Sequence, residues 1–97
     1  MNGLHIKKVK LSGVETIEEV KMDSKCLSVM VKNLTDADIS VGIGSKTEVS
    51  IEDSTTIKPN CYQIVFINAN EDSGEFFDTL VVFGSGKGTV ECIGILY

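Results

Sequence analysis

The sequence of 97 residues predicts an all-β fold, and three observations support this prediction. Apolar and polar residues alternate with a period of two in several short runs, as in strands with one buried face. Turn-forming Gly, Asn, Asp and Ser recur about every ten residues between these runs. Val, Ile, Tyr and Phe, which favour strands, are concentrated in short segments. We therefore expect a single antiparallel β-sandwich, Ig-like or jelly-roll-like, of about seven to nine short strands, with a small barrel as the alternative.

The clearest alternation lies between residues 26 and 44. Residues 27–32 and 39–43 each place apolar side chains at every second position. Asn33, Asp36 and Asp38 separate the two runs, and such side chains bond to nearby backbone groups and favour turns. We therefore expect strands at 26–32 and 39–43 joined by a polar turn. Asn33 also begins a formal N-glycosylation motif, which we interpret as part of this turn.

The first 25 residues contain two further candidate strands. Residues 5–11 and 14–22 flank Ser12-Gly13, with lysines in the first segment and glutamates in the second. A hairpin of the two would place unlike charges opposite each other, each pair contributing about 0.2 to 1 kcal/mol. A short amphipathic helix is the alternative for 14–22. The whole chain, 1–97, is expected to be one domain in which 1–25 form an amino-terminal arm or an extra hairpin.

The second half of the chain continues the strand and turn pattern. Residues 48–52 alternate weakly, and Pro59-Asn60 is a plausible turn. Residues 62–67 and 80–83 are apolar at successive positions, as in central strands covered on both faces. An acidic loop at 68–78 separates them. The glycine-rich residues 84–88 are expected to form a hairpin turn leading to a terminal strand at 89–97.

Composition restricts the function. The formal net charge is -5 and all nine basic residues are lysine, so the chain lacks the arginine fork that favours phosphates and guanines. We expect no nucleic-acid partner. There is no apolar run of about 20 residues and no signal-peptide layout at the amino terminus, so we expect no membrane partner and synthesis in the host cytoplasm without secretion. Three cysteines without a close pair fit small buried side chains in a reducing compartment.

No candidate site for catalysis, cofactor or metal emerges from the residues. The segment beginning at Gly84 departs from the phosphate-loop spacing, and His5, the single histidine, has no assignable nucleophile. The carboxylates of the acidic loop match no ordered calcium loop. Lys7, Lys8 and Lys10 fit a solvated edge strand. The adjacent Phe76 and Phe77 would point to opposite sides of an extended segment, so either both pack beneath the loop or one is exposed as an anchor for another chain.

Three segments together resemble small virion proteins of tailed bacteriophages. They are a strand with an Asn-led turn at 29–42, the turn at Ile57-Lys58-Pro59, and residues 80–82 followed by a small-residue turn and Val90-Glu91-Cys92. The resemblance covers residues 26–97. The chain departs from the group in residues 1–25, in Asn60 where glycine often follows the proline, and in the acidic loop.

The resemblance implies a structural, non-enzymatic part of a virus particle. Capsid decoration on the head exterior is the preferred role, with the major capsid protein or another virion protein as partner and with self-association as a dimer or trimer. A tail or fibre component, or a carbohydrate-binding sandwich module, is the alternative. The expected contact residues are Ile6, Lys7, Lys8 and Lys10 on an amino-terminal segment free to extend, and Phe76 and Phe77.

Overall fold

The computed structural model describes residues 4–67 and 77–96. These residues form seven strands and one 3-10 helix: β1 (Leu4–Ser12), β2 (Thr16–Thr35), β3 (Ile39–Ile43), η1 (Ile51–Asp53), β4 (Thr55–Ile57), β5 (Cys61–Ile67), β6 (Phe77–Gly84) and β7 (Lys87–Leu96). The all-β prediction is confirmed. Within the described residues no helix is long and apolar enough to span a bilayer.

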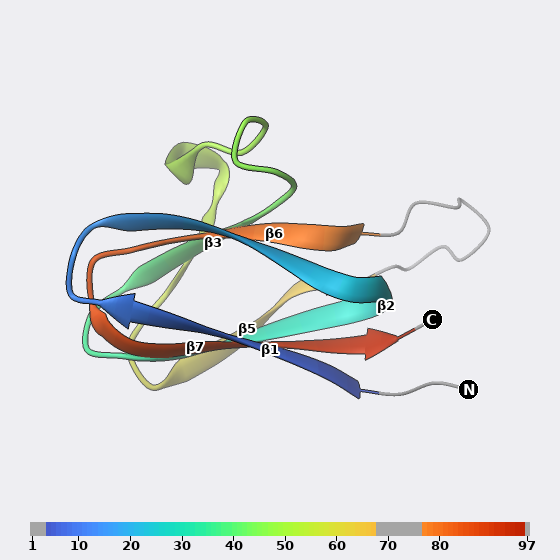
Figure 1. The fold of residues 1–97 in the computed structure, drawn as a ribbon, viewed down its shortest axis with the longest axis horizontal. Coiled ribbons are helices and arrows are strands. Elements are labelled where there is room, and N and C mark those ends of the chain that lie inside the picture. Colours follow the sequence, from blue (N-terminus) through green and yellow to red (C-terminus); the bar gives the residue numbers. More distant parts are fainter. Residues whose placement is uncertain (1–3, 68–76, 97) are drawn as a thin grey trace.

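The strands form two four-stranded antiparallel sheets that share the long strand β2 (Figure 1). Residues 28–35 of β2 belong to sheet I, in the order β1-β7-β2-β5. Residues 16–21 of β2 belong to sheet II, in the order β2-β6-β3-β4. The ladder register is irregular between Lys21 and Cys26, where the strand passes from one sheet to the other.

The two sheets form a sandwich and do not close into a barrel. If β2 is counted as two strands, the order in which the chain visits the sheets is that of a jelly roll. The sandwich prediction is therefore confirmed, and of the two expected topologies the structure has the jelly roll. In Figure 1 sheet I is the lower layer and sheet II the upper layer.

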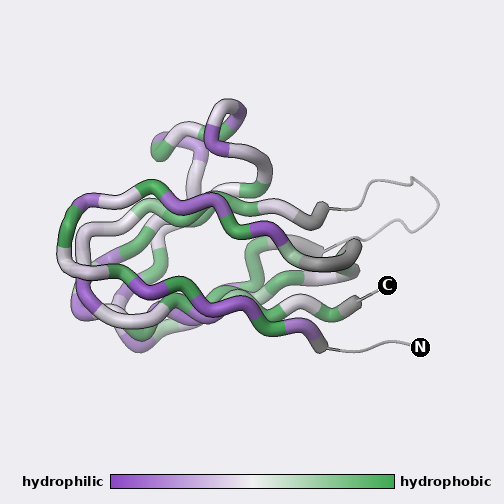
Figure 2. Tube along the Cα trace, in the orientation of Figure 1, coloured by the Kyte–Doolittle hydropathy of each residue, from purple (hydrophilic) through white to green (hydrophobic). Residues whose placement is uncertain are grey.

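The core lies between the sheets and consists of alternate residues from both. In β2, for example, Val29 and Val31 point inward and are almost fully buried, while Met30 and Lys32 lie on the outer face. The same alternation is visible along the other strands in Figure 2. The core residues are Leu11, Val20, Met22, Cys26, Val29, Val31, Ile39, Val41, Ile57, Leu80, Val82, Val90 and Cys92.

Strand pairing corrects two expectations. The chain does reverse after Ser12, but β1 pairs with β7, whereas residues 16–21 pair with β6. The expected hairpin of 5–11 with 14–22 is therefore wrong, and so is the helical alternative for 14–22. The hairpin expected around residues 84–88 is also wrong, because β6 and β7 lie in different sheets. In a jelly roll these short turns cross between layers.

Three strand assignments also change. Residues 48–52 form no strand, and η1 begins at Ile51. The short strand β4 was not expected. Residues 80–83 are central as predicted, but β5 is an edge strand on which Tyr62 and Ile64 are 68% and 53% exposed.

Candidate functional site

Three turns meet at one end of the sandwich and are fixed by two polar side chains. The buried Asn33 amide donates to the carbonyls of Ala37 and Ile57, at 2.8 and 2.9 Å. Its Oδ1 accepts hydrogen bonds from the Thr35 N–H and hydroxyl, at 2.9 and 2.6 Å. Asn33 therefore has an internal structural role, as the turn interpretation of its motif expected.

Asp36 connects this turn to the glycine-rich turn. Its Oδ1 accepts a hydrogen bond from the Lys87 N–H at 2.7 Å, and its own N–H donates to the Lys87 carbonyl at 3.2 Å. The N–H of Gly13 donates to the Gly86 carbonyl at 3.0 Å. The turns after β1, β2 and β6 are thus held together.

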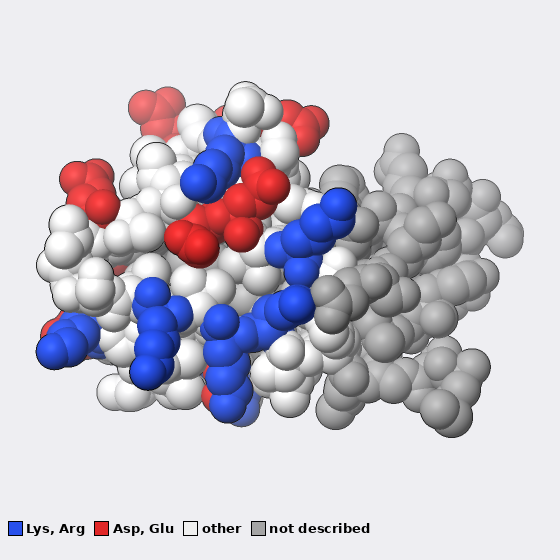
Figure 3. All heavy atoms as spheres, viewed as in Figure 1, with Lys and Arg blue, Asp and Glu red and all other residues white. Residues whose placement is uncertain are grey.

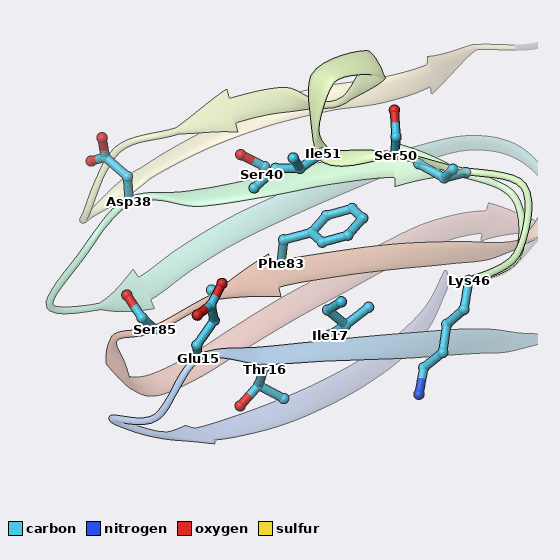
Figure 4. Close-up of a pocket in the computed structure, with 12 residues that line it drawn as sticks. Glu15, Thr16, Ile17, Asp38, Ser40, Lys46, Ser50, Ile51, Phe83 and Ser85 are labelled. Carbon is cyan, nitrogen blue, oxygen red and sulfur yellow. The ribbon is translucent and has the colours of Figure 1, made fainter.

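These turns form one end of a groove on the outer face of sheet II, with a volume of about 700 Å³. Ile17 and Ser40 each pair with Phe83 in the ladder, so the three side chains form one row across the floor. Figure 4 shows the floor between the carboxylates of Glu15 and Asp38 at one end and Lys46 at the other.

Residues 44–54 form the wall of the groove. Val49 lies over Gly42, where any Cβ would collide with its side chain. The Lys46 N–H donates to Glu19 Oε2 at 2.9 Å, which attaches the segment to β2. Within the segment, hydrogen bonds from the Ser45 hydroxyl and N–H lower the pKa of Glu48.

The groove suits a ligand that combines hydroxyl groups with an apolar surface. Carboxylates, an ammonium group and hydroxyls surround it, but its aromatic floor is only slightly accessible: Phe83 is 9% exposed, whereas Ile17 and Ile51 are 51% and 57% exposed. Among the described residues no three His, Cys, Asp or Glu side chains are close enough to hold a metal ion. This groove was not predicted from the sequence, although the continuous apolar run at 80–83 and the small Gly42 are signals of a covered outer face.

The contact residues expected near the amino terminus lie on β1, an edge strand of sheet I. Ile6 is 50% exposed, Lys8 and Lys10 are exposed, and Lys7 is half-buried. Lys8 Nζ lies 3.9 Å from Glu91 Oε2. Residues 4–11 are thus not free to extend, because the whole strand pairs with β7. Its other edge pairs with no described strand.

The second expected contact falls largely outside the described residues. Phe76 and the loop at 68–76 lie outside them, and Phe77 is described only as the first residue of β6, paired with Cys26.

The cysteines are partly as expected. Cys26 and Cys92 are buried, whereas Cys61 is exposed. Burial raises the pKa of Cys92 to about 12.

Charge is unevenly distributed over the face shown in Figure 3. Figure 3 shows a cluster of carboxylates in the upper middle of this face, with lysines below it, to its right and directly above it. The unlike charges expected to face each other in one hairpin lie in different sheets, because β1 pairs with β7 and residues 16–21 pair with β6.

No protein-family model and no curated protein sequence matches this chain. Among solved structures, a cupin superfamily protein from Desulfitobacterium hafniense superposes with a TM-score of 0.53 at 7% identity, over 97% of this chain and 68% of that protein. PirA superposes with a TM-score of 0.55 at 12% identity, over 94% of this chain and 93% of PirA. A Bacillus endospore appendage protein gives a TM-score of 0.50 at 8% identity, over 100% of this chain and 88% of that protein. At these identities the likeness is one of fold.

Proposed function

We propose that this protein is a non-enzymatic structural component of a bacteriophage particle, a capsid decoration protein that binds the exterior of the head and stabilises it. The observation that carries the proposal is exposed apolar surface on a small sandwich. Large hydrophobic side chains are exposed on both outer faces, on η1 and in the turn after β1: Ile6, Val14, Ile17, Leu34, Ile51, Tyr62, Ile64 and Ile95. Surface of this kind favours adhesion to another protein.

The edge of β1 offers a second means of attachment. An unpaired strand edge presents backbone donors and acceptors to which a strand of another chain can add. Apolar burial at about 25 cal/mol per Å² would supplement those hydrogen bonds. The Bacillus endospore appendages, which form disulfide-linked pili, illustrate the use of such a fold in an assembly. We extend this use to the present chain by proposal.

Binding to purified phage heads tests the proposal. We expect the chain to co-sediment with heads, and the double variant Lys8→Glu with Lys10→Glu to bind at least tenfold more weakly because it reverses the charge along the β1 edge. Phe76→Ala with Phe77→Ala tests the second expected contact. Lys58→Glu is the control: it reverses the charge of one lysine on the exposed turn before β5, and this variant should bind normally.

Two results would reject parts of the proposal. If the unmodified chain fails to co-sediment with heads, the decoration role is wrong. If both double variants bind like the unmodified chain, the assigned contacts are wrong. Imaging of the assembled particle distinguishes the head from the tail or fibre alternative.

The groove on sheet II supports a second candidate function, binding of a carbohydrate. Its carboxylates and hydroxyls match sugar hydroxyls, and Ile17 and Ile51 offer apolar contact. A glycan array probed with the isolated chain tests this function. Binding that is lost in Asp38→Asn and Glu15→Gln would establish it, and an array without signal would reject it.

A further inference from the structure

An apolar row crosses all four strands on the outer face of sheet I. Residues paired in an antiparallel ladder share a face, and the register pairs Ile6 with Ile93, Ile93 with Met30, and Met30 with Ile64. Ile6 and Ile64 are 50% and 53% exposed at the ends of the row. Ile93 and Met30 are half-buried between them.

A mixed row runs beside the apolar one. The register places Lys8, Glu91, Lys32 and Tyr62 in line across the same strands. The acidic residue is thus flanked by two lysines, one of them the Lys8 whose ammonium lies 3.9 Å from its carboxylate. On the opposite side of the apolar row lies Ile95, which is 43% exposed.

We propose that this face binds the same face of a second copy of the chain, with the two-fold axis parallel to the strands. This axis reverses the order of the strands, so β1 lies over the partner's β5 and β7 over the partner's β2. Ile6 then meets the partner's Ile64, and Ile93 meets the partner's Met30. Each contact occurs twice, as symmetry requires.

Charge complementarity favours a second copy in this orientation. Reversal of the mixed row brings Glu91 opposite the partner's Lys32, and Lys32 opposite the partner's Glu91. Lys8 meets the partner's Tyr62, whose ring offers a cation–π contact. A two-fold axis along the rows would instead place the charged row against the side chain of the partner's Ile95, which would desolvate charges without pairing them.

The size of the face determines the strength of the dimer. Four strands about 4.8 Å apart, with these three rows of side chains about 6.8 Å apart, cover roughly 400 Å² in projection. This falls short of the roughly 800 Å² that each partner buries in a standard stable interface. We therefore expect a dimer in the micromolar range, which repetition on a surface would reinforce.

Charge reversal tests the pairing directly. Sedimentation velocity of the full chain over a range of concentrations should show a reversible dimer. Glu91→Lys and Lys32→Glu should each weaken it at least tenfold, because each places like charges opposite each other twice. A mixture of the two variants should recover the dimer, since each altered position then meets an unlike charge on the partner.

The mixture also separates pairing between chains from effects within one chain. Lys32 and Glu91 are ladder partners within the sheet, and mixing cannot restore that contact. Glu52→Lys on η1 is the charge control: it makes the same change as Glu91→Lys outside the proposed interface and should leave the dimer unchanged. Ile64→Asp should abolish the dimer, whereas Ile51→Asp, at a similarly exposed site near the other sheet, should not.

A chain that stays monomeric at every concentration would overturn the inference, as would a dimer that is insensitive to both charge reversals or a mixture that fails to recover. The inference adds a self-association surface to the proposed structural role. Because the measurement uses the purified chain without heads, its failure is distinguishable from a failure of head binding.

Discussion

At the scale of single residues, Asn33 shows why a polar side chain is retained in the core. Its amide donates to carbonyls that follow β2 and lie in β4, and its oxygen accepts from Thr35. Buried backbone groups without partners destabilise the folded state, and Asn33 supplies partners to segments from both sheets.

Asn33→Ala should lower the free energy of unfolding by about 3 kcal/mol, since it leaves buried donors and acceptors unpaired. Chemical denaturation measures this change. Asn60→Gly is the matched control: Asn60 is exposed and has a φ of 62°, which glycine adopts readily, so a change within about 0.5 kcal/mol is expected. Equal stability of the two variants would contradict the role assigned to Asn33.

Cys92 should make stability depend on alkaline pH. Burial raises its pKa from 9.0 to about 12, so the folded protein keeps the proton that the unfolded chain releases. The full stability is present below about pH 8.5, and the free energy of unfolding should fall above that by up to about 1.4 kcal/mol per pH unit.

The comparison with Cys92→Ala between pH 8 and 10.5 isolates this effect. The variant should be less stable at pH 8 because it leaves a cavity, but its stability should decline less steeply with pH. If the stability of both proteins declined equally steeply with pH, the Cys92 thiol would not contribute to the pH dependence.

At the scale of elements, the sequence predicted most strands but few of their neighbours. The alternation in residues 26–32 and 39–43 identified β3 and the second part of β2. The ladder of β1 with β7 joins the two ends of the described chain, and no local pattern encodes such a pairing. The run at 62–67 resembles the run at 80–83 in composition, yet one forms an edge strand and the other a central strand, because neighbours distant in sequence determine their coverage.

The groove was hidden from sequence analysis for a similar reason. Its floor follows from the continuous apolar run in β6, which indicates a strand covered on both faces. Its wall depends on the irregular residues 44–54, which cross the outer face of sheet II. The contact of Val49 with Gly42 fixes their position, and neither residue alone indicates the other.

Gly42→Ala should displace residues 44–54 and lower the free energy of unfolding by about 1 to 3 kcal/mol, because the added methyl group overlaps Val49. Val49→Ala should also destabilise the fold, through lost packing. The double variant should be more stable than the sum of the single effects predicts, since the smaller side chain leaves room for the methyl group. Denaturation of all four proteins tests this coupling, and strictly additive effects would exclude the contact.

At the scale of the whole molecule, the jelly roll makes the first and last described strands, β1 and β7, neighbours in one sheet. The expectation of an arm or extra hairpin in residues 1–25 treated that segment as an addition to the sandwich. In the structure β1 is a strand of sheet I that covers one side of β7, and Leu11 contributes to the core. Removal of β1 exposes both an edge of β7 and part of the core.

Deletion of residues 1–12 should therefore unfold or aggregate the chain rather than trim it. Exposure of the β7 edge creates a site for intermolecular strand pairing, and the loss of Leu11 alone is expected to cost about 2 to 5 kcal/mol, a large fraction of the stability of a small domain. Circular dichroism and size-exclusion chromatography measure the outcome. Deletion of residues 1–3, which leaves every described strand intact, should keep the melting temperature. A monomeric truncated protein with an unchanged melting temperature would show that the segment is a dispensable arm and that the sandwich is complete without β1.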